Sequence, residues 1–249
     1  MSVAIITGAS SGMGKCFVQN IRYYYPDIDC IWLVSRNRSK LITLAKKLKV
    51  DTKIIPLDLT NENDIIDFSA ILKKEKPKIK VLVCSAGIGK MGPFIGQPLK
   101  EASNMIDVNI KGLTAINHLC IPYMTYDSHI INMCSAAAFI CQSDFAVYAA
   151  TKSYVLSFCD GIGKELKGRG IYVTAVCPGA VDTPFIKKAQ KYKKIKSFKK
   201  LFIVKKECVV HKALWDSRWR RTRSIYGIPM KLFYHLCRLI PHKIMMLFV

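Results

Sequence analysis

The chain has 249 residues, of which 51% are hydrophobic, so it can bury the core of one large domain. The chain has 39 lysine and arginine residues against 17 aspartate and glutamate residues, a net charge of +22, and most of this excess lies after Lys164. Such an excess of positive charge favours a negatively charged partner, which can be a lipid headgroup, a nucleic acid, an acidic carrier protein or an anionic substrate. The ten cysteines and five histidines are scattered without metal-ligand spacing, so we expect no metal site. Scattered cysteines are also typical of a reducing compartment, and no apolar run reaches the length of a membrane span, so we expect a cytoplasmic protein.

Apolar runs alternate with amphipathic segments through the first 180 residues. The predicted strands are residues 3–7, 30–34, 53–57, 80–84, 129–133 and 172–177. The predicted helices are residues 15–24, 39–49, 61–74, 100–124 and 145–166, the third of them capped by Thr60. This alternation indicates a parallel sheet covered by helices on both faces, which is the doubly wound Rossmann-type α/β fold in a single domain.

After Gly179 the pattern changes. Residues 186–206 carry ten lysines and no acidic residue, with aromatic residues between them. A helix over 206–216 and a strand over 224–226 are predicted next. In the segment 229–249 the basic residues Lys231, His235, Arg238 and His242 share one helical face while apolar residues fill the rest, so we expect a basic amphipathic C-terminal extension.

The segment 7–14 reads TGASSGMG and joins the first predicted strand to the first helix. Glycines at Gly8, Gly12 and Gly14 let a backbone approach a pyrophosphate closely, and the N-terminus of the following helix offers free N–H groups. A strand-to-helix turn that binds nothing is the alternative. The position directly after the first strand favours dinucleotide binding, with Ser10, Ser11 and Met13 in the same loop.

The second predicted strand ends at Ser35-Arg36, where NAD-binding proteins of this fold usually carry a carboxylate. An arginine there can stack on adenine and hold a 2′-phosphate, so Arg36 favours NADP(H) over NAD(H), although it is also one more cation in a basic protein. Asp58, which precedes Leu59 after the third strand, is a candidate to bind the adenine amino group or is simply a turn residue.

Tyr148 and Lys152 lie four residues apart in a predicted helix and therefore share one face. A cation beside a phenol lowers the phenol pKa, and a tyrosine with a lowered pKa can act as a general acid near neutral pH. Such pairs also occur by chance on exposed helices, so this spacing alone does not establish a site.

Taken together, these motifs resemble those of the short-chain dehydrogenase/reductase family of NAD(P)-dependent oxidoreductases. The match adds Asn109 in VNIKG, Ser135 placed thirteen residues before Tyr148, and Pro178-Gly179 followed by Thr183, and it spans residues 3–184 in family order. One departure is Cys84-Ser85, which replaces the family's two asparagines before Ala86-Gly87. We expect this change to shift hydrogen bonds without abolishing activity.

The resemblance implies a role for each matching residue. Tyr148 would donate the proton to a substrate carbonyl, Lys152 would lower the tyrosine pKa and bind the nicotinamide ribose, Ser135 would hold the carbonyl oxygen, and Asn109 would support a water-linked relay to Lys152. The residues expected to contact the cofactor are Gly8, Ser10, Ser11, Gly12, Met13, Gly14, Arg36, Asp58, Leu59, Ala86, Gly87, Tyr148, Lys152, Pro178, Gly179, Val181 and Thr183.

The resemblance also implies an organisation: a dehydrogenase domain over 1–228, a basic substrate lid over 184–222, and the extension 229–249. The expected activity interconverts a hydrophobic ketone and alcohol, steroid-like or fatty acyl, with NADPH. A non-catalytic cofactor-binding regulator or membrane-interaction protein is the alternative. We expect the basic last third to contact an anionic substrate, to contact the surface of a membrane, or to have no partner, and we expect no nucleic-acid binding. We expect the chain to form a homodimer or homotetramer.

Overall fold

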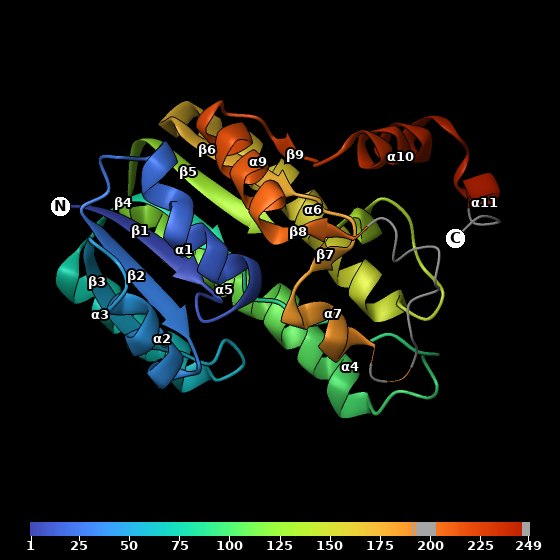
Figure 1. The fold of residues 1–249 in the computed structure, drawn as a ribbon, viewed down its shortest axis with the longest axis horizontal. Helices are drawn as coiled ribbons and strands as arrows, with labels where there is room; N and C mark the ends of the chain where they lie inside the picture. Colours follow the sequence, from blue (N-terminus) through green and yellow to red (C-terminus); the bar gives the residue numbers. More distant parts are fainter. Residues whose placement is uncertain (191, 193–202, 246–249) are drawn as a thin grey trace.

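Seven parallel strands form one sheet in the computed structural model, which describes residues 1–190, 192 and 203–245. The sheet order is β3-β2-β1-β4-β5-β6-β9 (Figure 1). The strands are β1 (Ser2–Thr7), β2 (Cys30–Ser35), β3 (Asp51–Pro56), β4 (Lys78–Cys84), β5 (Met124–Met133), β6 (Ile171–Val176) and β9 (Arg223–Ser224). Because the order reverses between β1 and β4, the carboxyl ends of these two strands open the crevice where this fold binds ligands.

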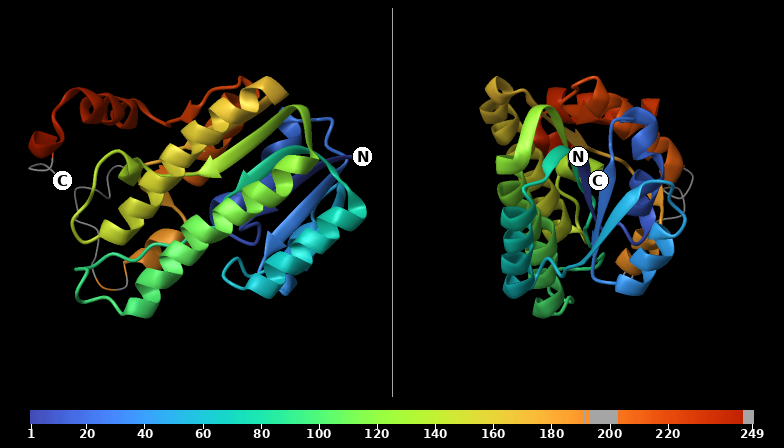
Figure 2. Two further views of the ribbon diagram at one scale, coloured as in Figure 1. Left: turned by 180° about the vertical axis from the view of Figure 1, so that it is seen from behind. Right: turned by 90° about the vertical axis from the view of Figure 1, so that its left-hand side faces the viewer.

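Helices cover both faces of the sheet (Figure 2). One face packs against α3 (Glu62–Glu75), α5 (Leu113–Cys120) and α6 (Ala146–Leu166), and the other against α1 (Gly12–Tyr24), α2 (Arg38–Ala45) and α9 (Lys206–Arg218). Within β1, Val3 and Ile5 enter the first core, whereas Ala4 and Ile6 enter the second. A strand buried on both faces needs apolar residues at every position, which explains why the sequence shows continuous apolar runs.

The predicted helix over 100–124 is wrong as a single element. It consists of α4 (Leu99–Ile106), a π-helical segment at Asp107–Gly112, α5 and a short 3₁₀ turn at Ile121–Tyr123. Gly112 lies so close to Leu59 that a Cβ atom there would come within 2.6 Å of the Leu59 Cβ. The widened π turn holds Asn109, which points into the protein interior and is fully buried.

A smaller correction concerns the start of α3. The helix is capped by Asn61, whose side chain accepts a hydrogen bond of 2.9 Å from the Asn63 amide, and not by Thr60. The Thr60 hydroxyl instead donates to Asp58 Oδ1 at 2.9 Å. Both residues suit a cap position, so the sequence alone does not distinguish them.

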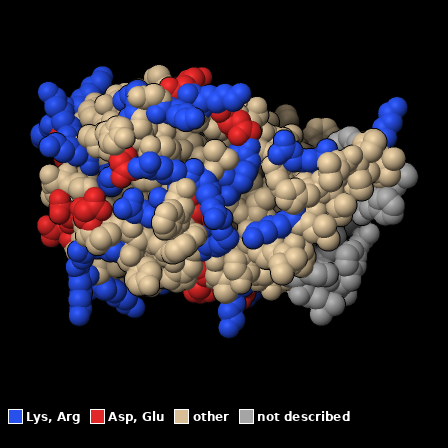
Figure 3. Space-filling view, turned by 90° about the horizontal axis from the view of Figure 1, so that it is seen from above, with Lys and Arg blue, Asp and Glu red and all other residues tan. Residues whose placement is uncertain are grey.

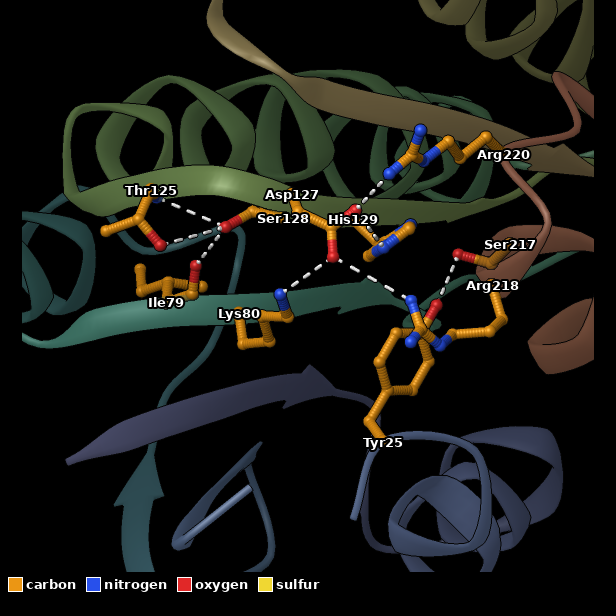
Figure 4. A network of polar contacts seen from close by, with 10 residues as sticks. All are labelled: Tyr25, Ile79, Lys80, Thr125, Asp127, Ser128, His129, Ser217, Arg218 and Arg220. Atoms are coloured by element: carbon orange, nitrogen blue, oxygen red, sulfur yellow. Dashed lines mark hydrogen bonds and ion pairs between the residues drawn. The ribbon is translucent and has the colours of Figure 1, made fainter. Parts of the chain in front are cut away.

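The edge of the sheet opposite the crevice is held together by a charged network (Figure 4). Asp127, near the start of β5, lies 3.1 Å from Lys80 Nζ and 3.0 Å from Arg220, and Arg218 is 3.7 Å away. His129 is fully buried beside it. This network ties β4, β5 and the end of α9 together at the edge remote from the predicted site, so we assign it to stability.

Part of the last third of the chain lies beyond the sheet. The short strands β7 (Val181–Asp182) and β8 (Val204–Lys205) pair beside α7 (Pro184–Ala189), and α10 (Ile228–Leu239) and α11 (His242–Met245) extend away from the body (Figure 1). Within the predicted lysine-rich lid, residues 191 and 193–202 lie outside the described residues. None of the helices in the described part of the chain is both long and apolar enough to cross a membrane.

Candidate active site

The four residues predicted to be catalytic converge at the carboxyl edge of the sheet. Asn109 comes from the π-helical segment, Ser135 follows β5 directly, and Tyr148 and Lys152 lie one turn apart near the start of α6. All except Ser135 are buried. The fold therefore brings together residues that are up to 43 positions apart in the sequence (Asn109 to Lys152).

Asn109 is fixed by three hydrogen bonds. Its Oδ1 accepts from the Ile88 amide at 2.9 Å, and its Nδ2 donates to the Ile88 carbonyl at 2.8 Å and to Thr151 Oγ1 at 3.1 Å. The Thr151 hydroxyl in turn donates to the Tyr148 carbonyl at 2.7 Å. Thr151 therefore links Asn109 to α6. This residue is not identified from the sequence, where its only signal is its position between Tyr148 and Lys152.

Lys152 points into the same region. Its Nζ donates to the Met133 carbonyl at 2.8 Å and lies 5.7 Å from the centre of the Tyr148 ring. Gly87 packs beside it, since a Cβ atom on Gly87 would stand 3.3 Å from Asn109 Oδ1 and 3.6 Å from Lys152 Nζ. The ammonium group therefore lies between the end of β5, the turn after β4 and the catalytic helix.

The net direction of the Tyr148 pKa differs from the direction that its spacing to Lys152 predicts. Burial raises the pKa of the Tyr148 phenol above its ordinary value, and a hydrogen bond with Ser135 only partly opposes that rise. Burial also lowers the pKa of Lys152. The physical reason is that the enclosed site disfavours charge on both groups, so the phenol is protonated and able to donate its proton.

Apolar side chains enclose the Tyr148 ring. Phe145 stacks on it with ring centroids 4.2 Å apart, and Phe185 of α7 tilts against it at 5.5 Å. Gly89 lies against the same group, because a Cβ atom there would stand 2.7 Å from the Phe185 ring. Ile88, Met91 and Met105 complete the cluster. The surroundings of the phenol are therefore suited to an apolar molecule.

The glycine loop has the geometry of a phosphate cradle. Gly8 has φ of +68° and Gly12 of +54°, both in the region that favours glycine, and a Cβ atom at Gly14 would overlap the Gly8 carbonyl. Gly12 begins α1 and faces Thr183, whose Cβ would stand 3.8 Å from a Cβ on that glycine. The loop with Ser10, Ser11 and Met13, the α1 N-terminus and Thr183 thus border one space that fits a pyrophosphate.

Beside this loop, the end of β2 presents polar groups suited to an adenosine ribose. Ser35 Oγ is buried and has no hydrogen-bond partner in the described part of the chain. Arg36 is two-thirds exposed, with its guanidinium 3.6 Å from Asp58. Leu59 follows and packs against Gly112. A buried hydroxyl that has no partner in that part of the chain, next to an exposed arginine, fits the adenosine end of a dinucleotide.

The other predicted cofactor contacts border the same crevice. Gly8 packs on Ala86, whose amide donates to Thr7 Oγ1 at 3.3 Å. The Pro178 carbonyl accepts from the Ala136 amide at 2.8 Å, so the turn after β6 touches the segment after Ser135. Val181 is buried in β7, and Gly179 lies against Met230 of α10.

At the departure from the family pattern, the Cys84 thiol is buried 3.4 Å from Asn117 Nδ2. Cysteine therefore takes a core position here. Among the described residues, no group of three or more histidine, cysteine, aspartate or glutamate side chains is arranged to hold a metal ion.

Comparison with known proteins agrees with this geometry. The sequence model described as short chain dehydrogenase matches residues 2–194. An uncharacterized oxidoreductase of Staphylococcus epidermidis is 34% identical over 184 residues, which cover 73% of this chain and 79% of that protein, and one of Staphylococcus aureus is 32% identical over 73% and 78%. A short-chain dehydrogenase from Sphingobium yanoikuyae, solved in complex with NADPH, superposes with a TM-score of 0.79 at 25% identity over 97% of each chain.

Proposed function

Since the chain belongs to the short-chain dehydrogenase family and is therefore an NAD(P)-dependent oxidoreductase, we propose that it interconverts a hydrophobic ketone and the corresponding alcohol, with NADPH as the preferred cofactor. The observation that carries this proposal is the apolar enclosure of the Tyr148 phenol by Phe145 and Phe185. A phenol in such surroundings can protonate the oxygen of an apolar carbonyl compound, and steroid-like or fatty acyl ketones are the first candidates.

In the proposed reaction each residue has a separate task. Tyr148 donates its proton to the carbonyl oxygen, and Ser135, whose hydrogen bond to the phenol lowers the tyrosine pKa, orients that oxygen. Lys152 holds the nicotinamide ribose, and Asn109 fixes the turn at Ile88 beside it. The bound cofactor supplies the hydride.

The first test is NADPH absorbance with a panel of hydrophobic ketones, comparing the parent protein with Tyr148→Phe. The variant keeps the ring that packs on Phe145 and loses only the hydroxyl. We expect its rate to fall about a hundredfold or more, the size of a typical general-acid contribution, with a much smaller change in NADPH affinity. Equal rates in the two proteins would refute the catalytic role of Tyr148 and would favour the alternative of a non-catalytic cofactor-binding protein.

Preference for NADPH rests on Arg36. The guanidinium is exposed beside the buried Ser35 hydroxyl, where it can bind a 2′-phosphate, and its one ion pair in the described structure is the 3.6 Å contact with Asp58. Arg36→Asp is expected to reverse the preference toward NADH. Arg38→Asp, an equal charge change two residues on, serves as the control and should leave the ratio of NADPH to NADH affinity unchanged.

We also propose a cytoplasmic enzyme that contacts a membrane surface through α10. The side of this helix turned from the body exposes Ile228, Leu232 and Leu239, with Lys231 and Arg238 on the adjoining row. That arrangement suits the interface of an anionic bilayer. Leu232→Glu with Leu239→Glu should prevent sedimentation with anionic vesicles without changing ketone reduction, and vesicle binding that survives both changes would rule this contact out.

The proposed assembly is a homodimer or homotetramer that pairs through α4, α5 and α6. Ile106 and Tyr154 are exposed on these helices, where a second copy would cover them. Sedimentation equilibrium of the parent protein and of Tyr154→Glu tests this, since a monomeric parent would contradict it.

A further inference from the structure

The arm formed by α10 leaves a groove between itself and the body, away from the catalytic tyrosine. Two hollows, of about 140 and 430 Å³, lie along it. Both are lined by Arg223 of β9 and Tyr234 of α10, so they adjoin at these two side chains and we treat them as the two ends of one groove; Tyr148 lines neither. Figure 3 shows basic side chains gathered on the face that carries α9 and the start of α10.

The smaller end of the groove is strongly cationic. Lys212, Arg221, Arg223 and Lys231 line it, and its one carboxylate, Asp216, pairs with Lys212 and, at 3.3 Å, with Arg221. Arg223 pairs with Asp160, which lines the wider end.

Four cations therefore face two carboxylates, which leaves an excess of two positive charges. Among the described residues, no ion pair engages Lys231. This excess matches the charge of about −1.5 to −2 that a phosphate monoester carries at pH 7. A volume of about 140 Å³ holds only a few waters at about 30 Å³ each, so a phosphate group with its oxygens can replace them.

The wider end has walls of mixed character. Ala138, Phe139, Leu156 and Cys237 form its apolar side, Asp160, Thr222, Arg223 and Arg238 form its polar side, and its volume is about three times that of the cationic end. Arg238 closes one side, where its guanidinium donates to the Tyr234 hydroxyl at 2.7 Å. An apolar chain can occupy this space while a charged head group stays among the four cations.

The geometry points to a binding site for an amphiphilic phosphate ester in this groove, with the phosphate between α9, β9 and α10 and the apolar chain along α6. Arginine suits the head group because its planar donors bind phosphate oxygens in pairs. The same chemistry is offered by a soluble alkyl or acyl phosphate and by the phosphate of a membrane lipid, and the two sources are distinguished below.

Isothermal titration calorimetry of the full-length protein with monomeric decyl phosphate tests the site, with decyltrimethylammonium as the probe of opposite charge. No cofactor is present, so the result is independent of the proposed reductase activity. We expect saturable binding of decyl phosphate only. Arg221→Gln with Lys231→Gln should weaken it about tenfold or more, whereas Lys46→Gln with Lys47→Gln, which removes the same charge beside α2, should change it less than about twofold.

A third variant separates the two ends of the groove. Leu156→Gln should weaken decyl phosphate and leave the weaker binding of inorganic phosphate unchanged. The site is overturned if decyl phosphate shows no saturable binding, if the control pair weakens it as much as the groove pair, or if decyltrimethylammonium binds equally well. Circular dichroism confirms that each variant is folded before its result is used.

Vesicles distinguish the two sources of the phosphate. If phosphatidic acid vesicles, but not phosphatidylcholine vesicles, sediment the protein, and Arg221→Gln alone, which leaves Lys231 of α10 in place, abolishes this, the ligand is a membrane lipid. If decyl phosphate binds in the groove and the groove pair leaves vesicle binding unchanged, the ligand is a soluble phosphate ester. Both outcomes support the site when decyl phosphate also shows saturable binding, and the absence of that binding refutes it.

Discussion

Two buried asparagines allow the catalytic contribution at Asn109 to be separated from its structural one. Asn109 and Asn117 are both fully buried and lie eight residues apart, about two helical turns. Asn109 hydrogen-bonds Ile88 and Thr151 near Lys152, whereas Asn117 bonds the Leu113 carbonyl at 2.9 Å and the Asn132 side chain at 3.2 Å in the core. Asn109→Ala and Asn117→Ala therefore each remove a carboxamide group from a fully buried position.

The expected loss of stability is similar for both variants. Asn109→Ala leaves the Ile88 amide and carbonyl without their partner. Asn117→Ala leaves the side-chain carbonyl of Asn132 without its partner and removes one of the two acceptors of the Asn132 side-chain amide, the other being Cys159 Sγ. A buried polar group without its partner costs about 1–3 kcal/mol, so each variant should lose about 3 kcal/mol of unfolding free energy. Urea unfolding followed by circular dichroism measures both values under identical conditions.

The expected loss of activity differs. Asn109→Ala releases the Ile88 turn and its link through Thr151 to the catalytic helix, and misplacement of reacting groups by about 1 Å costs about a hundredfold in rate. Asn117→Ala should stay within about threefold of the parent, because it contacts neither reacting group nor cofactor loop. NADPH oxidation with the best ketone of the panel is measured at a temperature where both variants are fully folded. Equal losses of kcat would refute the assignment, since stability alone would then explain them.

Three further predictions follow from other parts of the structure. Burial lowers the pKa of His129 from 6.5 to about 4, so the unfolded chain takes up this proton at higher pH than the folded one. Stability should therefore fall by about 3 kcal/mol between pH 7 and 4, and urea unfolding of His129→Phe should show a smaller fall. Gly14→Ala should abolish NADPH binding measured by fluorescence, because its Cβ would overlap Gly8, whereas Gly161→Ala on α6, which has no neighbour within 4 Å, should leave binding intact. Phe185→Ala should raise KM for apolar ketones while the dissociation constant of NADPH stays unchanged, and an unchanged KM would contradict the apolar enclosure.

The strands could be located from sequence because a strand buried on both faces must be apolar throughout. Six of the seven strands in the sheet overlap the predicted apolar runs, and the last, β9, overlaps the strand predicted at 224–226 by one residue. The pair β7 and β8 was not predicted, because two-residue strands leave no apolar run to detect. The carboxyl ends of the strands could also be predicted from the sequence. Because these ends meet at one edge of a parallel sheet, Gly8, Gly87, Ser135 and Pro178 are predicted to lie at that edge.

The details inside the site depend on three-dimensional packing that no local pattern encodes. The π turn at Asn109 ends at Gly112, which packs against Leu59, a residue distant in sequence. The spacing of Tyr148 and Lys152 correctly predicts that they share a helix face. It does not predict the direction of the tyrosine pKa, because burial by Phe145, Phe185 and the sheet outweighs the nearby ammonium group.

The position of Met230 links the arm to the cofactor crevice. A Cβ atom on Gly179 would stand 2.7 Å from Met230 Sδ, so the first turn of α10 packs directly on the Pro178-Gly179 turn. The same helix carries Lys231 and Tyr234 into the groove described above. A ligand that fixes α10 therefore also fixes one wall of the crevice. The segment that this chain adds to a minimal dinucleotide-binding domain is α10, and it contacts the Pro178-Gly179 turn at the border of the crevice.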